Sequence, residues 1–161
     1  SVYGLDISKD SLLYAKQKAG RLNVIKGDVK KLPFCEGFDG VSCASSLGFK
    51  EKDIIVEGIR RALIPGGFVA VTGIEGTKKE QGMKIMGSEV LKAYKEGKLK
   101  LTKEDAQKVV DFVSKMMGGL DSSQYMAEAL ERNKLTIKQI KPFCQDTAYF
   151  ILAQKEGRAL K

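Results

Sequence analysis

Residues 1–8 read SVYGLDIS, a short apolar run that ends in a carboxylate and is followed by a serine. Such a run is typical of a buried strand, and a serine directly after it is a preferred N-cap residue of a helix. The stretch therefore predicts a strand, an acidic tip at Asp6 and a helix that begins after Ser8. In an open α/β sheet, a carboxylate at this position is placed to accept hydrogen bonds from both hydroxyls of a ribose. We therefore expect a nucleotide site at this end of the sheet.

The composition is that of one globular domain. The chain has 161 residues, of which 43% are hydrophobic and 30% charged, and it is long enough to bury a sizeable core. The formal charge of +8, from 28 Lys and Arg against 20 Asp and Glu, is compatible with an anionic substrate or with nucleic acid. The lysines are spread along the chain, however, and solvated helix faces explain most of them. Binding to nucleic acid is therefore not favoured.

The sequence contains no pattern typical of a metal site or of a membrane-spanning segment. Cys35, Cys43 and Cys144 are widely separated, and the chain has no histidine, which excludes a Cys/His zinc box. We interpret the three as reduced thiols of a cytoplasmic protein. No apolar run approaches the ~20 residues that a membrane-spanning helix needs, and residues 1–8 do not resemble a signal peptide. We predict no metal site and no membrane span.

Strand and helix patterns alternate through the first half of the chain. The predicted strands are 2–6, 22–26, which ends in Gly27-Asp28, the small-residue run 38–44 and the apolar run 68–72; the predicted helices are 9–19 and 54–63. Residues 29–34 contain Pro33 and are expected to form a loop, and residues 65–67 (PGG) are expected to end the second helix in a tight turn. This alternation predicts a Rossmann-like, doubly wound α/β sheet.

The pattern changes after Gly73. No strand signal appears from about Lys78 to Leu130. Residues 75–120 are interpreted as a helical insertion, with one amphipathic helix that begins at Thr102 and carries an apolar stripe from Val109 to Met117. Two strand-like runs, 136–144 and 147–154, close the chain, and their short connection requires an antiparallel hairpin. We therefore predict a single domain over residues 1–161, with a core of 1–74 and 121–161 and a cap of 75–120.

Four signals occur in order and at regular intervals: YGLDIS at 3–8, Gly27-Asp28 followed by LPF at 32–34, FDGV at 38–41 and LIPGG at 63–67. Together they resemble the class I methyltransferases that use S-adenosylmethionine. The resemblance extends from Val2 to Thr72 and is strongest to the small-molecule branch typified by ubiquinone and menaquinone biosynthesis methyltransferases. It implies a transferase whose cofactor is S-adenosylmethionine and whose partner is a small-molecule acceptor.

The resemblance also implies roles for residues at three strand ends. Asp6 would bind the ribose hydroxyls, and Ile7 would pack on the adenine. Asp28 would accept from the adenine amino group, while the N–H of Val29 would donate to a ring nitrogen. The methionine part of the cofactor would be lined by Ala44 and Ser45. A structural role as strand-end caps is the alternative for both carboxylates, and a plain loop role is the alternative for Ala44 and Ser45.

The sequence departs from the family pattern before Asp6. The glycine-rich turn of such folds lies about 20 residues before the acid, whereas only five residues precede Asp6. We expect a further segment of at least about 30 residues before Ser1, because the turn needs this interval and its strand a further 5–6 residues. That strand would lie between the strand that ends at Asp6 and the one that ends near Ala44. We therefore predict a gap between these two strands, or a strand from another molecule in it.

Three functions remain open from the sequence. The first is methyl transfer, which needs alignment of the acceptor and exclusion of water more than a dedicated base. No catalytic residue can be assigned; a base would be a carboxylate, tyrosine, lysine or water, since histidine is absent. The second is a catalytically inactive, methyltransferase-like module that binds a partner, and direct pairing of the two strands would favour it. The third is a NAD-dependent oxidoreductase, which uses a similar acid. The acceptor and the oligomeric state are not specified.

Overall fold

A computed structural model describes residues 1–44, 51–98, 102, 104, 105, 107–109, 111 and 122–157. In chain order its elements are β1 (Val2–Asp6), α1 (Lys9–Lys18), β2 (Leu22–Lys26), η1 (Val29–Lys31), β3 (Phe38–Ala44), α2 (Lys52–Ala62), β4 (Leu63–Ile74), η2 (Gly76–Lys78), α3 (Lys79–Lys95), α5 (Ser123–Arg132), β5 (Leu135–Phe143) and β6 (Ala148–Lys155). Here η denotes a 3₁₀ helix. The predicted strands 2–6, 22–26 and 38–44 have the predicted bounds.

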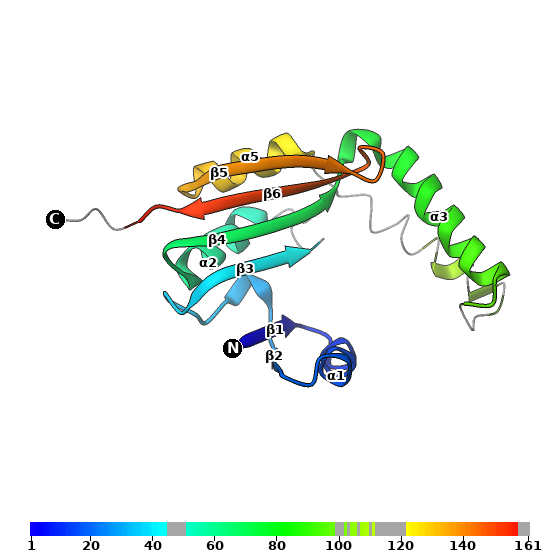
Figure 1. Cartoon of the computed structure of the whole chain (residues 1–161), viewed down its shortest axis with the longest axis horizontal. Coiled ribbons are helices and arrows are strands. Elements are labelled where there is room, and N and C mark those ends of the chain that lie inside the picture. The colour runs from blue at the N-terminus through cyan, green and yellow to red at the C-terminus, as the bar shows by residue number, and fades with distance from the viewer. Residues whose placement is uncertain are drawn as a thin grey trace.

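The strands form two sheets. β1 and β2 pair in parallel, and the second sheet has the order β3-β4-β6-β5, in which β3 and β4 are parallel and β6 is antiparallel to both of its neighbours. α2 and α5 lie side by side along the larger sheet, while α1 packs on β1 and β2 (Figure 1). The predicted Rossmann-like α/β fold with a C-terminal antiparallel hairpin is confirmed.

The predicted gap lies between β1 and β3. The two strands belong to different sheets, although their arrows point the same way in Figure 1. Between them is a cavity of about 530 Å³, which is lined by the consecutive residues 1–5 and 40–44. Successive side chains of a strand point to opposite faces, so a cavity that touches consecutive residues of two strands lies along their edges. The expected gap is therefore present, and the direct pairing that would have favoured a partner-binding module is not observed.

The core lies between the larger sheet and the two helices along it. Alternate residues of β4 and β6 point to this side and are fully buried, as a strand with one covered face requires. α2 and α5 contribute residues spaced three or four apart, which places them on one face of each helix. Each of these large apolar side chains stabilises the fold by about 1.5–3 kcal/mol. The largest are Ile55, Val56, Ile59, Leu63, Val69, Val71, Met126, Leu130, Leu135 and Ile151.

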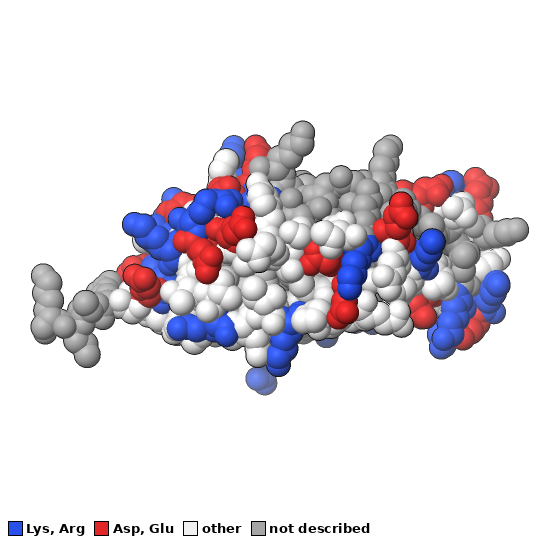
Figure 2. Space-filling view, turned by 90° about the horizontal axis from the view of Figure 1, so that it is seen from above, with Lys and Arg blue, Asp and Glu red and all other residues white. Residues whose placement is uncertain are grey.

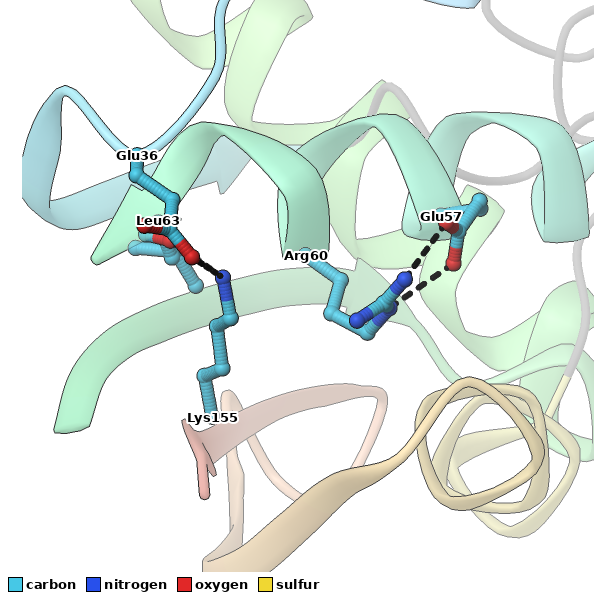
Figure 3. A network of polar contacts seen from close by, with 5 residues as sticks. All are labelled: Glu36, Glu57, Arg60, Leu63 and Lys155. Carbon is cyan, nitrogen blue, oxygen red and sulfur yellow. Dashed lines mark hydrogen bonds and ion pairs between the residues drawn. The ribbon is translucent and has the colours of Figure 1, made fainter. Parts of the chain in front are cut away.

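A lysine at the end of β6 fastens the beginning of β4 (Figure 3). Nζ of Lys155 donates to the carbonyl oxygen of Leu63 at 2.7 Å and pairs with the Glu36 carboxylate at 3.3 Å. The Lys155 side chain is only 13% exposed. Nearby on α2, Arg60 donates two hydrogen bonds to Glu57, at 2.8 and 2.7 Å. The junction of α2 and β4 is therefore held by contacts from the opposite end of the chain.

We predicted that the PGG sequence ends α2 in a separate tight turn, and this prediction is wrong. The helix ends at Ala62, and residues 65–67 lie inside β4, which begins at Leu63 rather than Phe68. Leu63 has extended backbone (φ −73°, ψ 140°) and pairs with Phe38 of β3, which explains the earlier helix end. Residues 65–67 instead form an irregular part of the strand. The irregularity is seen in two places: the β3–β4 register shifts between Phe38 and Gly40, and Gly66 has a φ of 83°.

The connection of the C-terminal hairpin is also longer than predicted. β5 ends at Phe143 and β6 begins at Ala148, so the turn spans residues 144–147 rather than 145–146 alone. Cys144, Gln145 and Asp146 all have left-handed φ angles of 50–61°. Three such residues in succession cannot continue a strand, which removes Cys144 from the predicted strand.

The predicted insertion is only partly described. α3 covers residues 79–95 as a helix, and Oγ1 of Thr102 accepts a hydrogen bond from the N–H of Asp105 at 3.1 Å, as expected at the start of a helix. Apart from Val109, the predicted apolar stripe of that helix lies outside the described residues.

We predict that Gly73→Ala destabilises the fold. A Cβ at Gly73 would overlap the ring of Tyr149, its partner on β6. Forcing extra volume into a packed site costs about 1–3 kcal/mol, and chemical denaturation should show this loss. Gly40→Ala is the matched control, because its Cβ would meet only the Phe68 carbonyl oxygen, at 3.8 Å. Equal stability of both variants would contradict the close packing at Gly73.

We also predict that the edges along the cavity exchange their amide hydrogens rapidly. β4 is paired on both sides, by β3 and β6, whereas β1 and β3 are each paired on one side. Hydrogen exchange measured by NMR should therefore give slower rates in residues 69–71 of β4 than at alternate amides of residues 40–44. β5, which is also an edge strand, serves as the reference. Equal protection of β3 and β4 along their whole length would show that the cavity is closed in solution.

Candidate functional site

The end of β1 places Asp6 at the carboxyl edge of the smaller sheet. Its Oδ1 accepts a hydrogen bond from the N–H of Ser8 at 2.7 Å, and Oγ of Ser8 in turn accepts from the N–H of Ser11 at 3.2 Å. Ser8 is thus the N-cap of α1, as predicted. Asp6 is exposed, and Ile7 beside it is 70% exposed, which is unusual for an isoleucine. One carboxylate oxygen and one apolar side chain are therefore presented together to solvent.

The end of β2 places a second carboxylate beside the first. Oδ1 of Asp28 accepts from the N–H of Lys30 at 2.9 Å and caps η1, in which Val29 is the first residue. The N–H groups at the start of a helix have no partner within it, so the N–H of Val29 remains available to a ligand. The Val29 side chain is half-buried against the core. This short 3₁₀ helix is the structural form of the loop predicted for residues 29–34.

The parallel register brings the two acids together. Asp6 lies opposite Lys26, and the N–H of Gly27 donates to the carbonyl oxygen of Asp6 at 3.0 Å. Because Asp28 follows directly, both carboxylates stand at the same edge of the sheet. The sequence pattern predicted that both carboxylates lie at strand ends.

An ion pair connects this edge to the start of α2. Nζ of Lys30 contacts Oε2 of Glu51 at 2.7 Å, which joins η1 to the residue before α2. The hydrogen bond and the charge of Glu51 raise the pKa of Lys30 above its ordinary value. No local pattern predicts this pair, because its members are 21 residues apart in the chain and neither belongs to a motif.

The end of β3 borders the cavity. Ala44 lines it and is exposed, and Val29 lines it from the side of η1. The structure therefore brings Ala44 and Val29 to one cavity, while Asp6, Ile7 and Asp28 stand at the adjoining sheet edge. Ser45 lies outside the described residues.

Glu75 is an acidic residue at a strand end that the sequence analysis did not select. It follows β4 directly, so its sequence signal equals that of Asp6: an apolar strand that ends in a carboxylate. Its oxygens accept hydrogen bonds from Ser123 and Thr77. Burial raises the pKa of Glu75, but these hydrogen bonds outweigh burial and leave the pKa below its ordinary value.

The described residues contain no group of three or more Cys, Asp or Glu side chains that could hold a metal ion. Within the same residues, no helix is long and apolar enough to cross a membrane. Figure 2 shows Lys and Arg interspersed with Asp and Glu over the face it presents, so the described part of this face has no continuous basic surface. Cys35 and Cys144 are exposed and Cys43 is buried, and the structure places none of these three in a disulfide.

Residues 1–71 match the model of a family described as a methyltransferase domain. The matched part contains both carboxylates, the cavity and β3. No curated protein matches the sequence significantly.

Solved structures match nearly the whole chain at low identity. They include a possible exported protein from Bordetella parapertussis (16% identity, TM-score 0.68, 96% of this chain and 53% of that one). A SAM-dependent methyltransferase from Aquifex aeolicus also matches (14%, 0.63, 96% and 68%), as does one from Methanosarcina mazei (17%, 0.64, 98% and 82%). The chain thus spans about half the length of the Bordetella protein. The fold is that of the Rossmann-like methyltransferases.

Proposed function

We propose that this protein transfers a methyl group from S-adenosylmethionine to a small-molecule acceptor. The observation that carries the proposal is the pair of carboxylates, Asp6 and Asp28, at adjacent strand ends of a Rossmann-like sheet, with an exposed isoleucine beside them. The methyltransferase-domain match and the methyltransferases of the same fold imply S-adenosylmethionine as the cofactor.

The residues present fit the nucleoside part of this cofactor. Oδ1 of Asp6 is engaged by the N–H of Ser8, which orients the carboxylate and leaves Oδ2 for the ribose hydroxyls. Ile7 offers an apolar surface for the adenine ring. Asp28 is held in the same way by the N–H of Lys30 and would accept from the adenine amino group, while the N–H of Val29 would donate to a ring nitrogen. Ala44 and Ser45 would line the methionine part.

The chemistry asks little of the protein beyond placement. When bound, S-adenosylmethionine supplies an activated methyl group on a sulfonium that is already a good leaving group. The two carboxylates would fix the nucleoside, and the apolar cavity walls would exclude water from the side of β3. Holding acceptor and methyl group in line can lower the barrier by ~7 kcal/mol or more. We assign no catalytic base.

The helical insertion is proposed as a cap over the acceptor, within a single domain whose core is residues 1–74 and 121–161. Ligands in open α/β sheets lie beyond the carboxyl ends of the strands, and α3 lies beyond the arrowheads of β3 and β4 in Figure 1. We further propose membership of the small-molecule branch typified by ubiquinone and menaquinone biosynthesis methyltransferases. We also propose a cytoplasmic location, where exposed cysteines such as Cys35 and Cys144 stay reduced.

We predict that Asp6→Ala weakens binding of S-adenosylmethionine, or of its demethylated product, by about 1–3 kcal/mol, since hydrogen bonds to a charged acceptor are lost. Isothermal titration calorimetry should show this as a roughly 5- to 150-fold rise in Kd. Asp6→Asn keeps an acceptor for the N–H of Ser8 and separates the loss of charge from a change in the turn. The matched control is Asp10→Ala, another exposed carboxylate, in the first turn of α1. An unchanged Kd for Asp6→Ala would remove Asp6 from the site, and a wild-type protein that binds neither nucleoside would overturn the proposed function.

A further inference from the structure

The carboxylate of Glu75 connects the two ends of the helical insertion. Glu75 is the first residue after β4, where the chain leaves the sheet. Its Oε2 accepts from both the N–H and the Oγ of Ser123, at 3.0 and 2.7 Å, and Ser123 is the first residue of α5, where the chain returns. Its Oε1 accepts from Oγ1 of Thr77 in η2 at 3.2 Å. One half-buried side chain therefore holds the exit and the return 48 residues apart in sequence.

The same short segment is attached to the C-terminal hairpin. The N–H of Glu75 donates to the carbonyl oxygen of Thr147 at 2.9 Å, and Nζ of Lys78 pairs with Oδ2 of Asp146 at 3.4 Å. Residues 146 and 147 belong to the β5–β6 turn. η2 is thus fixed to the sheet by the backbone and the side chain of Glu75 and by the Lys78–Asp146 pair.

α3 depends on η2 for its direction. Among the described elements its principal contact is with η2, and Figure 1 shows it projecting away from the sheet. A helix of 17 residues is about 25 Å long. Because such a helix acts as a lever, a small rotation at η2 produces a large displacement at its far end.

We propose that Glu75 is a positioning residue, whose ionised carboxylate sets the direction of α3 relative to the sheet. The inference rests on the proposed function in one respect: α3 belongs to the part of the chain that would cover the acceptor. In that setting Glu75 determines how the cap stands over the carboxyl ends of the strands, without contacting the reacting atoms.

We call the hydrogen bonds from Ser123 and Thr77 to the Glu75 carboxylate the clamp. The strength of the clamp depends on pH in a defined direction. Three hydrogen bonds stabilise the charged form of Glu75, so its contribution is complete above the pKa of an unfolded glutamate and is lost as the pH falls through the lower folded value. The charged groups nearby are Lys78 of η2 and Asp146 of the hairpin turn, which pair with each other. The first turn of α5 carries no acidic residue that would compete for Ser123.

The test measures a distance, so it needs neither cofactor nor acceptor. Nitroxide labels are attached to Cys144 in the hairpin turn, which is exposed, and to Lys92→Cys on the exposed side of α3, in a Cys35→Ser background; Cys43 is buried. Double electron–electron resonance then gives the distribution of distances between turn and helix. At neutral pH we expect a narrow distribution of label distances in the protein with Glu75, and a distribution at least twice as wide in the Glu75→Gln variant. As the pH falls through the carboxyl range, the distribution should widen more in the Glu75 protein than in Glu75→Gln, which keeps the Lys78–Asp146 pair but has no carboxylate at position 75.

Two further variants keep the result interpretable. Ser123→Ala removes the 2.7 Å hydrogen bond but keeps the N–H donor, so we expect an intermediate width in a protein that retains its near-UV circular dichroism. Glu128→Gln is the matched control, because Glu128 lies on the same helix and accepts only a hydrogen bond from Gln124 among the contacts described. Equal widths for Glu75, Glu75→Gln and Ser123→Ala would overturn the proposal.

The experiments test the proposed function and the clamp independently, so either can be refuted without the other. If S-adenosylmethionine does not bind but Glu75→Gln widens the distribution, the clamp stands and the proposed function does not. If it binds with the same Kd to Glu75→Gln and the distribution stays narrow, the proposed function stands and the clamp is refuted.

Discussion

The structure depends on β4 being hydrogen-bonded on both edges. β3 pairs with it in parallel and β6 in antiparallel orientation, so it joins the N-terminal and C-terminal parts of the chain. Val69 and Val71 are fully buried against the helices on one face. A strand with both edges satisfied and one face covered exposes few backbone groups to water, and β4 shares this property with β6, so these two strands form the stable centre of the sheet. The Lys155–Leu63 contact and the Glu75–Ser123 contact fasten the two ends of β4.

The candidate site stands apart from this central strand. β1 and β2 form a separate sheet, which reaches the core through a few apolar contacts such as Leu5 and Val29 and through the ring of Tyr3 on Phe38, with 5.8 Å between the ring centres. The nucleoside-binding residues we propose are on this smaller unit, while Ala44 is on the larger one. The position of one sheet relative to the other therefore decides whether the two parts of the site face a common ligand.

The local elements were predictable because short-range signals determine them. Strands 2–6, 22–26 and 38–44 were predicted with the observed bounds, since each is an apolar or small-residue run bounded by a helix cap, a glycine or a proline. The same signals placed Asp6 and Asp28 at strand ends, where the structure has them. The errors occur where pairing overrides the local signal. β4 takes in residues 63–67 because β3 lies alongside Leu63, and the hairpin turn begins at Cys144 because the last cross-strand pair is Phe143 with Ala148.

By itself, the sequence determined the alternating strands and helices of the first half, the acidic strand ends and the antiparallel hairpin, because each of these depends on residues that are neighbours in the chain. Only the tertiary structure decided which distant groups meet. Lys30 reaches Glu51, Lys155 reaches the carbonyl of Leu63, and Glu75 receives Ser123 across 48 residues. No local pattern specifies such partners, because any exposed lysine or serine offers the same donors. They are selected by the packing of the strands and helices, which fixes the distance and direction between groups that the sequence keeps far apart.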